Sequence, residues 1–203
     1  MSRNIEKEVL SLFKECDALL RGHFKLTSGK HSEWYFEKIR LIEKPATLER
    51  LVNLLVERIL EKGEKFDYIV SPAYGAIAIG FLTALKLKKR FAFTQRLEEK
   101  MSLRSSFSGI EGGRALIVED VVTTGGSVKE VVDCLKQKGV VVTGIFSLVD
   151  RSGGELLIEG QGVKSLLAMK VENFEPEDCP LCKARIPIMK PGASDKKSLI
   201  NLD

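Results

Sequence analysis

The sequence of 203 residues lacks several features that would assign it to a simple class. No apolar run is long enough to cross a bilayer, so we expect no membrane-spanning segment. The first residues are charged and lack the apolar core of a signal peptide, so we expect a cytoplasmic protein. The net charge is only +4 and the basic residues are scattered, whereas nucleic-acid binding usually needs a concentrated basic face. Neither a membrane nor a nucleic acid is therefore an expected partner.

Histidine and cysteine are scarce, which limits the metal chemistry that the sequence predicts. The chain has two histidines and four cysteines. His23 and His31 are isolated from each other, and we expect surface or hydrogen-bonded side chains. Cys179 and Cys182 form a Cys-x-x-Cys pair, but a structural zinc site usually needs a second pair. Three interpretations of the cysteine pair therefore stay open. It belongs to a tight turn that anchors the tail, it forms a redox disulfide, or it binds zinc together with the other cysteines or a second subunit.

What the sequence has instead is an alternation of helical and extended patterns. Apolar residues at helical spacing predict helices over residues 5–20, 48–60, 76–87 and 127–138. Short apolar and β-branched runs predict strands over residues 68–70, 91–94, 115–118, 140–149 and 165–169. Alternating strands and helices predict an α/β fold, in which helices flank a parallel sheet. We expect a single domain over residues 1–174 and an irregular tail over 175–203, where proline, lysine and serine increase.

The most informative segment runs from Glu119 to Ser127, directly after the clearest buried strand. It reads Glu-Asp-Val-Val-Thr-Thr-Gly-Gly-Ser. Ligands bind at the C-terminal edge of open α/β sheets, and two carboxylates at that edge suit sugar hydroxyls or a hydrated Mg²⁺. The glycines and the following helix N-terminus suit a phosphate. An ordinary polar turn is the alternative, and the segment is neither a Walker A loop nor a dinucleotide-binding fingerprint.

The segment from Glu119 to Ser127 resembles the phosphoribosyl diphosphate signature of type I phosphoribosyltransferases. This resemblance implies their fold, with a small N-terminal hood region over about residues 1–40. It also implies that the acidic pair holds the ribose hydroxyls and that the Thr-Thr-Gly-Gly-Ser portion surrounds the 5-phosphate. The implied binding residues are Glu119, Asp120, Val121, Val122, Thr123, Thr124, Gly125, Gly126 and Ser127, with Arg96 and Lys100. The implied cofactor is Mg²⁺, which the substrate would hold, with Glu119 or Asp120 as further ligands.

Two other segments resemble the orotate enzymes of this family. Residues 22–30, with Ser32 and Tyr35, resemble their N-terminal segment, and Asp150-Arg151 resembles their orotate-binding pair. An arginine fork can grip the orotate carboxylate through two hydrogen bonds, although an arginine at a strand end is often a surface charge. The implied orotate-binding residues are Tyr35, Phe36, Thr123 and Arg151. The resemblance thus implies transfer of the 5-phosphoribosyl group to orotate, which gives orotidine 5'-phosphate and diphosphate in pyrimidine biosynthesis.

Residues 96–104 resemble the mobile catalytic loop of these enzymes. Arg96 and Lys100 occupy matching positions, and with Asp120 they are the catalytic residues that the resemblance implies. The loop would close over the diphosphate and exclude water. Because this loop reaches into the neighbouring subunit in the family, the resemblance also implies a homodimer with shared active sites.

The sequence departs from the common orotate pattern in several places. Leu97 replaces a lysine and Ser102 replaces a histidine, while Thr27 and Gly75 stand where some members carry lysine. Residues 101–104 and 178–183 resemble a divergent bacterial or archaeal branch of the family. Two alternatives therefore stay open, which are transfer to a purine or uracil and a non-catalytic regulator that senses phosphoribosyl diphosphate.

Overall fold

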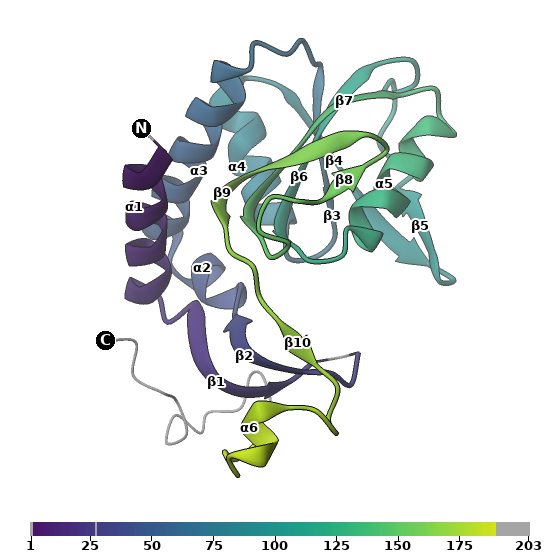
Figure 1. The fold of residues 1–203 in the computed structure, drawn as a ribbon. Coiled ribbons are helices and arrows are strands. Elements are labelled where there is room, and N and C mark those ends of the chain that lie inside the picture. Colours follow the sequence, from purple (N-terminus) through teal and green to yellow (C-terminus); the bar gives the residue numbers. More distant parts are fainter. Residues whose placement is uncertain (1, 27, 190–203) are drawn as a thin grey trace.

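The computed structural model describes residues 2–26 and 28–189, so Thr27 and the end of the predicted tail, residues 190–203, lie outside the described residues (Figure 1). The helices are α1 (Ser2–Glu15), α2 (Ile39–Glu43), α3 (Pro45–Glu61), α4 (Ile77–Leu87), α5 (Gly126–Lys136) and α6 (Pro180–Lys183). The strands are β1 (Leu19–Lys25), β2 (His31–Phe36), β3 (Tyr68–Pro72), β4 (Arg90–Leu97), β5 (Lys100–Leu103), β6 (Arg114–Val122), β7 (Val141–Asp150), β8 (Leu157–Ile158), β9 (Gln161–Ala168) and β10 (Asn173–Phe174).

The main sheet has the strand order β5-β4-β3-β6-β7-β9-β8. The five central strands are parallel, and the short edge strands β5 and β8 are antiparallel to their neighbours. Helices α1, α3 and α4 cover one face and α5 covers the other (Figure 1). The predicted α/β fold with a parallel sheet between helices is therefore confirmed. In the described part of the chain, no helix has both the length and the apolar character that a membrane span requires.

Strand β6 joins the two halves of the hydrophobic core. Leu116 and Val118 pack with the α1, α3 and α4 side of the sheet, whereas Ala115 and Ile117 pack with the α5 side. All four side chains are fully buried, as expected for a strand whose successive side chains point to opposite, covered faces. Full burial of one such aliphatic side chain contributes about 1.5–3 kcal/mol, so β6 is held firmly from both faces.

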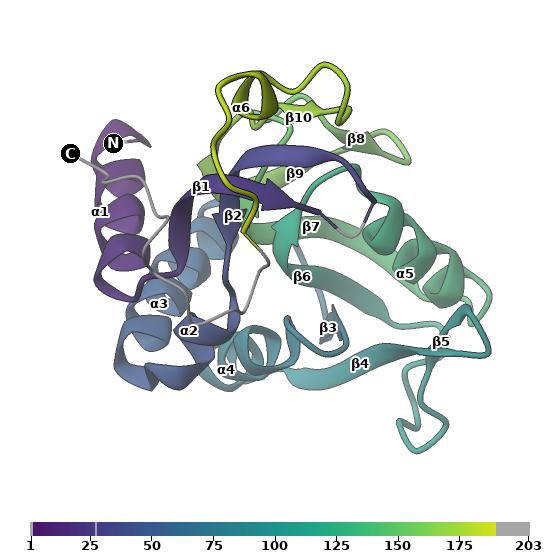
Figure 2. The same ribbon diagram turned by 90° about the horizontal axis from the view of Figure 1, so that it is seen from below.

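A second, small sheet has the order β1-β2-β10, and we call these three strands the hood. The hood lies beyond the C-terminal end of β9, and so at the C-terminal ends of the strands parallel to it (Figures 1 and 2). The pairing of β1 with β2 shifts register between Arg21 and Phe24. Met189 forms an isolated bridge with Phe24, so the described end of the chain returns to the hood.

The structure corrects one predicted boundary at the start of the chain. The apolar spacing predicted a helix to residue 20, but α1 ends at Glu15 and Leu20 belongs to β1. Asp17 adopts a left-handed backbone (φ 51°), and the amide of Ala18 donates to the carbonyl of Phe13 at 2.9 Å. This hydrogen-bond pattern is that of a Schellman motif, which ends a helix and redirects the chain.

The turn at the start of α5 predicts a stability effect. Gly125 has φ +77°, and a Cβ there would lie 2.9 Å from Leu156 Cδ2 and 3.0 Å from Ile158 Cδ1. Gly125→Ala should lower the free energy of unfolding by about 1–2 kcal/mol because alanine disfavours the left-handed backbone. Overpacking against Leu156 and Ile158 should lower it by about 1 kcal/mol or more in addition. Gly112→Ala is the matched control, because Gly112 has φ +71° in open space. Urea unfolding should rank Gly125→Ala clearly below Gly112→Ala, and equal stability of the two variants would contradict this account of the turn.

Candidate active site

A cavity of about 1060 Å³ lies between the hood and the C-terminal ends of β6 and β7. Its lining comes from three parts of the fold, namely the hood with the residues that adjoin its strands, the end of β6 with its loop, and the residue after β7. The lining residues are Lys25, Leu26, Ser28, Lys30, Tyr35, Phe36, Lys38, Asp120, Val121, Thr123, Thr124, Arg151 and Asn173. The volume is at the upper end of the range for small-molecule sites, about 300–1,000 Å³.

The parallel pairing of β6 with β7 brings two of these regions together. Val122 is in register with Asp150, so the residues after the two strands emerge side by side. The amide of Arg151 donates to the carbonyl of Val122 at 2.8 Å and extends this pairing by one residue. The loop after β6 and the side chain of Arg151 therefore share one edge of the sheet, where open α/β sheets bind ligands.

The acidic pair at the end of β6 is buried and held by the backbone. Glu119 Oε1 accepts from the amide of Asp120 at 2.9 Å, and Asp120 Oδ1 accepts from the amide of Val121 at 2.6 Å. Burial, and then the negative charge of Asp120, raise the pKa of Glu119 well above its usual range. Asp120 lines the cavity, so it is the member of the pair that is placed to contact a ligand.

Lys38 is a site residue that the sequence analysis missed. Its Nζ lies 2.9 Å from Asp120 Oδ2, although its side chain is 47% exposed. Burial lowers the pKa of Lys38, but the charge and hydrogen bond of Asp120 and the charges of Glu119 and Tyr35 outweigh burial and raise it. A lysine just before α2 has no recognisable spacing to β6, so only the folded chain reveals this pair.

Gly75 lies against this ion pair. A Cβ at Gly75 would approach Asp120 Oδ2 to 2.1 Å and Lys38 Nζ to 2.7 Å. Any side chain at this position would therefore have to displace the ends of both charged groups. The departure noted at position 75 thus has a steric reason, because a glycine leaves room for Lys38 beside Asp120.

The segment from Thr123 to Ser127 joins β6 to α5 and includes the first two residues of that helix. Gly125 is the N-cap of that helix in a left-handed conformation, and its carbonyl accepts from the amide of Lys129 at 2.8 Å. The side chains of Thr123, Thr124 and Ser127 are exposed. Exposed hydroxyls next to the free amides of a helix N-terminus form a suitable environment for a phosphate.

Arg151 is a partly buried cation whose hydrogen-bonding capacity is incompletely used. Its Nη2 donates to Asn173 Oδ1 at 3.0 Å and to Ser32 Oγ at 3.3 Å. Its Nε is buried without a partner, and among the described residues no carboxylate pairs with it. Burial lowers the pKa of the guanidinium, as expected for a cation without a counter-charge. An anionic ligand in the cavity would supply the missing partner.

The two aromatic residues predicted for the base pocket differ in their packing. Both Tyr35 and Phe36 line the cavity. Phe36 is also a core residue and makes an edge-on contact with Phe13, with ring centroids 5.7 Å apart. Tyr35 is partly buried and packs against Phe24 at 5.4 Å, and burial raises the pKa of its hydroxyl. Tyr35 is therefore the less tightly packed of the two aromatic residues that line the cavity.

Arg96 and Lys100 lie apart from the cavity, on the hairpin of β4 and β5 at the edge of the main sheet. Arg96 pairs with Glu130 at 2.7 Å and donates to the carbonyl of Glu99 at 3.2 Å. Lys100 is exposed. Within one chain, these two predicted catalytic residues do not join Asp120.

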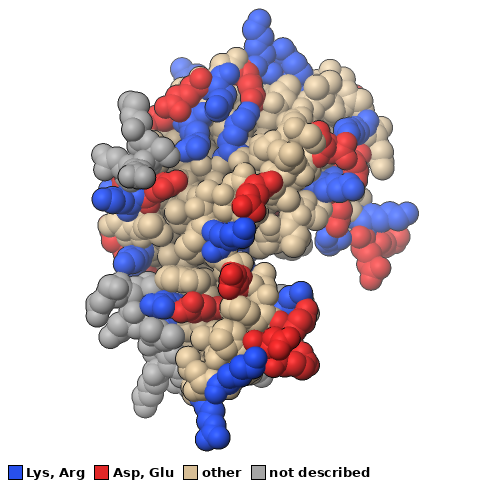
Figure 3. Space-filling view, viewed as in Figure 1, with Lys and Arg blue, Asp and Glu red and all other residues tan. Residues whose placement is uncertain are grey.

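The remaining predicted site residues surround the cavity. Tyr35, Phe36, Asp120, Val121, Thr123, Thr124 and Arg151 line it, while Glu119, Val122, Gly125, Gly126 and Ser127 are their neighbours in β6 and its loop. On the face shown in Figure 3, acidic and basic side chains are interspersed. Four cations line the cavity, so its wall suits an anionic ligand; they are Lys25, Lys30, Lys38 and Arg151.

Comparison with known proteins agrees with this geometry. The family described as "Phosphoribosyl transferase domain" matches residues 41–177. The orotate phosphoribosyltransferase of Caldicellulosiruptor bescii is 40% identical over 187 residues, which cover 92% of this chain and 97% of that protein. The orotate phosphoribosyltransferase of Desulforamulus reducens is 41% identical over 187 residues, covering 92% of this chain and 96% of that protein.

A solved structure shares the fold. The crystal structure of orotate phosphoribosyltransferase from Aeropyrum pernix superimposes with a TM-score of 0.70 at 26% sequence identity, covering 78% of this chain and 92% of that one. The fold class implied by the signature loop is therefore confirmed. Because the family match spans more than half of the sequence and the relatives align over nearly all of it, this chain belongs to the phosphoribosyl transferase family.

Proposed function

We propose that this protein transfers the 5-phosphoribosyl group from phosphoribosyl diphosphate to orotate, giving orotidine 5'-phosphate and diphosphate in the synthesis of pyrimidine nucleotides. The observation that carries the proposal is Arg151, a partly buried cation without a carboxylate partner among the described residues, beside the signature loop. The names of the relatives from C. bescii and D. reducens agree with it. We expect the reaction to take place in the cytoplasm.

In this proposal the signature loop binds the sugar substrate. Asp120 would accept hydrogen bonds from the ribose hydroxyls, with Glu119 behind it. The exposed hydroxyls of Thr123, Thr124 and Ser127 and the free amides at the start of α5 would bind the 5-phosphate. Support comes from the position of Asp120 in the cavity wall, next to this loop.

The acidic pair also fits Mg²⁺, which prefers oxygen ligands and is often held by one or two carboxylates together with substrate phosphates. One oxygen of Asp120 contacts the half-exposed side chain of Lys38 rather than the backbone, so this oxygen would be able to exchange partners. Bound with the substrate, the ion would neutralise charge on the departing diphosphate. Lys38 and Asp120 would keep the charge of the site balanced before the substrate arrives.

The aromatic wall and Arg151 would position the acceptor. Orotate is planar and carries a carboxylate, so its ring suits Tyr35 and Phe36 while its carboxylate suits the guanidinium fork. The bond between the anomeric carbon and diphosphate breaks as a ring nitrogen of orotate forms a bond to that carbon, and the proton of that nitrogen passes to the departing diphosphate or to water. Because the diphosphate oxygens can accept this proton, the site needs no histidine as a general base, which agrees with a serine at position 102.

Arg96 and Lys100 would act on the diphosphate of a second subunit. Neither lines the cavity of its own chain, and their hairpin lies at the sheet edge. Helix α4 exposes Phe81 (54%) and Leu85 (63%), which are large apolar side chains suited to contact with a second copy. We therefore propose a homodimer with shared active sites.

Arg151 gives the test of the acceptor. Losing a charged, bidentate contact costs about 2–4 kcal/mol, so Arg151→Ala should reduce kcat/KM for orotate by roughly thirty- to a thousand-fold. Arg151→Lys should recover only part of this loss, because an ammonium lacks the planar fork. Binding of phosphoribosyl diphosphate, measured by calorimetry, should barely change.

Arg114→Ala is the matched control, because Arg114 pairs with Asp67 at the other end of β6. This variant should use orotate as the parent does. If Arg151→Ala also uses orotate as well as the parent, Arg151 is a surface charge and a uracil or purine acceptor becomes the better proposal.

Mixing variants tests the shared site. Lys100→Ala and Asp120→Asn should each have low turnover, but a heterodimer of the two has one site with both residues intact. Random exchange of subunits should therefore restore about a quarter of the parent activity. Heterodimers purified with two different tags, and no more active than the separate variants, would refute the shared site.

A further inference from the structure

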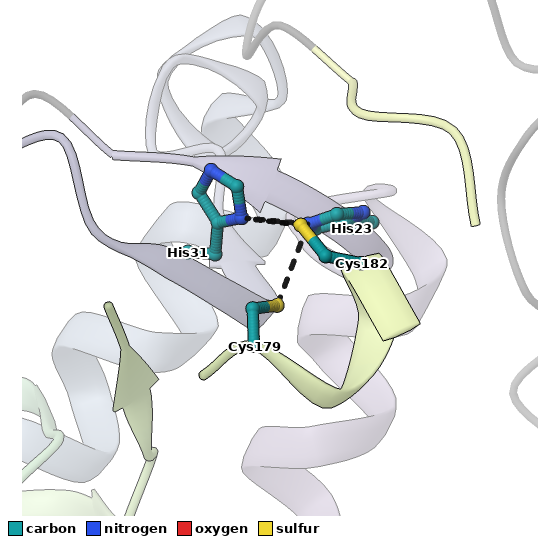
Figure 4. Close-up of side chains that lie close together, drawn as sticks. All are labelled: His23, His31, Cys179 and Cys182. Carbon is teal, nitrogen blue, oxygen red and sulfur yellow. Dashed lines mark hydrogen bonds between the residues drawn. The ribbon is translucent and has the colours of Figure 1, made fainter. Parts of the chain in front are cut away.

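Two histidines and two cysteines that are far apart in the sequence meet in the hood (Figure 4). His23 lies on β1 and His31 begins β2. Cys179 directly precedes α6, and Cys182 lies within that helix. One ligand atom from each residue lies within 4.8 Å of all the others. His23, His31 and Cys179 are at most 3% exposed. We call these four residues the His-Cys cluster.

The fold explains why this cluster was not visible in the sequence. The two histidines were expected to be surface or hydrogen-bonded side chains, and they are hydrogen-bonded to each other at 2.9 Å in a buried position. The register shift of β1 between Arg21 and Phe24 includes His23, whose ring lies beside that of His31 on the neighbouring strand β2. The second pair of ligands that Cys179 and Cys182 need therefore comes from two paired hood strands, and neither Cys16 nor Cys134 belongs to the cluster.

The distances in the cluster suit one small ion. Cys182 Sγ lies 3.3 Å from His31 Nδ1 and 3.7 Å from His23 Nε2, and Cys179 Sγ lies 3.6 Å from His23 Nε2. Tetrahedral zinc, with Zn–N of about 2.0 Å and Zn–S of about 2.3 Å, holds such ligand atoms roughly 3.3–3.8 Å apart. The nitrogen pair is the shortest at 2.9 Å, so it would open by a few tenths of an ångström around an ion of this size.

The surroundings of His23 orient its ring for metal binding. Its Nδ1 lies 2.7 Å from the carbonyl of Ile186, so the ring donates its proton there and turns the lone pair of Nε2 into the cluster. Histidine ligands of metals characteristically donate their other N–H to such a carbonyl. The carbonyl comes from the tail segment that also carries both cysteines, so one stretch of chain supplies two ligands and the support of a third.

A metal ion accounts for this cluster better than the alternatives. Without an ion, these buried groups have only the 2.9 Å hydrogen bond between the two rings and contacts of 3.3–3.7 Å with the thiols, which are weak hydrogen-bonding groups. A disulfide would use only the sulfur atoms, and both cysteines are free thiols in the structure. A two-iron cluster with histidines on one iron and cysteines on the other would separate nitrogen from sulfur, whereas here they alternate at 3.3–3.7 Å.

We infer that His23, His31, Cys179 and Cys182 form a structural zinc site. Four protein ligands of the nitrogen and sulfur type leave no open position, which is characteristic of structural rather than catalytic zinc. The ion would join β1, β2 and α6 into one unit. The same strands carry Lys25 and Tyr35 in the cavity wall, so zinc would fix the hood in position over the candidate active site.

Metal analysis of the full chain is the direct test, with the protein purified without a polyhistidine tag. Mass spectrometry should find about one zinc per chain. Cys182→Ser and His31→Ala should each lose at least about ten-fold in zinc affinity. Cys134→Ser is the matched control, because Cys134 is a buried cysteine on α5 outside the cluster, and it should keep its zinc.

Cobalt substitution keeps the test independent of whether the variants fold. The parent protein, stripped by a chelator and titrated with Co²⁺, should develop the intense visible bands of tetrahedral cobalt and a thiolate-to-cobalt charge-transfer band. Zinc should then displace the cobalt and abolish both. Stripping should also lower the Tm of the parent protein, and added zinc should restore it.

Three results would overturn the zinc site. The first is folded parent protein that contains no zinc and develops no cobalt bands. The second is a disulfide between Cys179 and Cys182, detected by mass in protein isolated under reducing conditions. The third is a folded Cys182→Ser variant that retains about one zinc per chain with unchanged affinity.

Discussion

The parallel pairing of β3, β6 and β7 is the constraint on which the rest of the structure depends. Because their C-terminal ends meet at one edge, Gly75, Asp120 and Arg151 are neighbours although they are distant in the sequence. Helices on both faces bury β6 from Ala115 to Asp120, so its acidic end is held rigidly. Rigid support matters for a site that must hold a sugar phosphate and an acceptor in fixed geometry, because small displacements strongly reduce the reaction rate.

The hood completes the cavity, and two kinds of polar contact hold it. At one end the ion pair between Lys38 and Asp120 links the residues after β2 to the main sheet. At the other end the His-Cys cluster ties β1 and β2 to the tail. The ion pair is partly exposed and would exchange partners in the proposed binding of the substrate, whereas three of the four cluster residues are buried and the proposed zinc would have no open position. The ion pair would thus serve substrate binding, and the His-Cys cluster would serve the stability of the hood.

The sequence alone allowed us to predict those parts of the molecule that depend on local patterns. The five parallel strands of the main sheet were predictable from their apolar and β-branched runs, but its short edge strands β5 and β8 were not predicted. The loop after β6 was predictable from its order of carboxylates, glycines and helix. The hood strands were not predicted, because β1 contains a register shift and β2 mixes polar and aromatic residues. Lys38 and the His-Cys cluster depend on contacts between distant segments, which no spacing in the sequence encodes. Lys100 lies away from the cavity of its own chain, and only the family resemblance, not any spacing in the sequence, had implied that its loop reaches a neighbouring subunit.

The central claim is that the cavity binds phosphoribosyl diphosphate beside an arginine that selects a carboxylate-bearing base. The most direct measurement is release of diphosphate by the purified protein in the presence of Mg²⁺, with orotate, uracil, adenine, hypoxanthine or no base. The account predicts rapid release with orotate and only background release with the others. Release that is equally fast with uracil or a purine, or absent with every base despite tight binding of phosphoribosyl diphosphate, would contradict it.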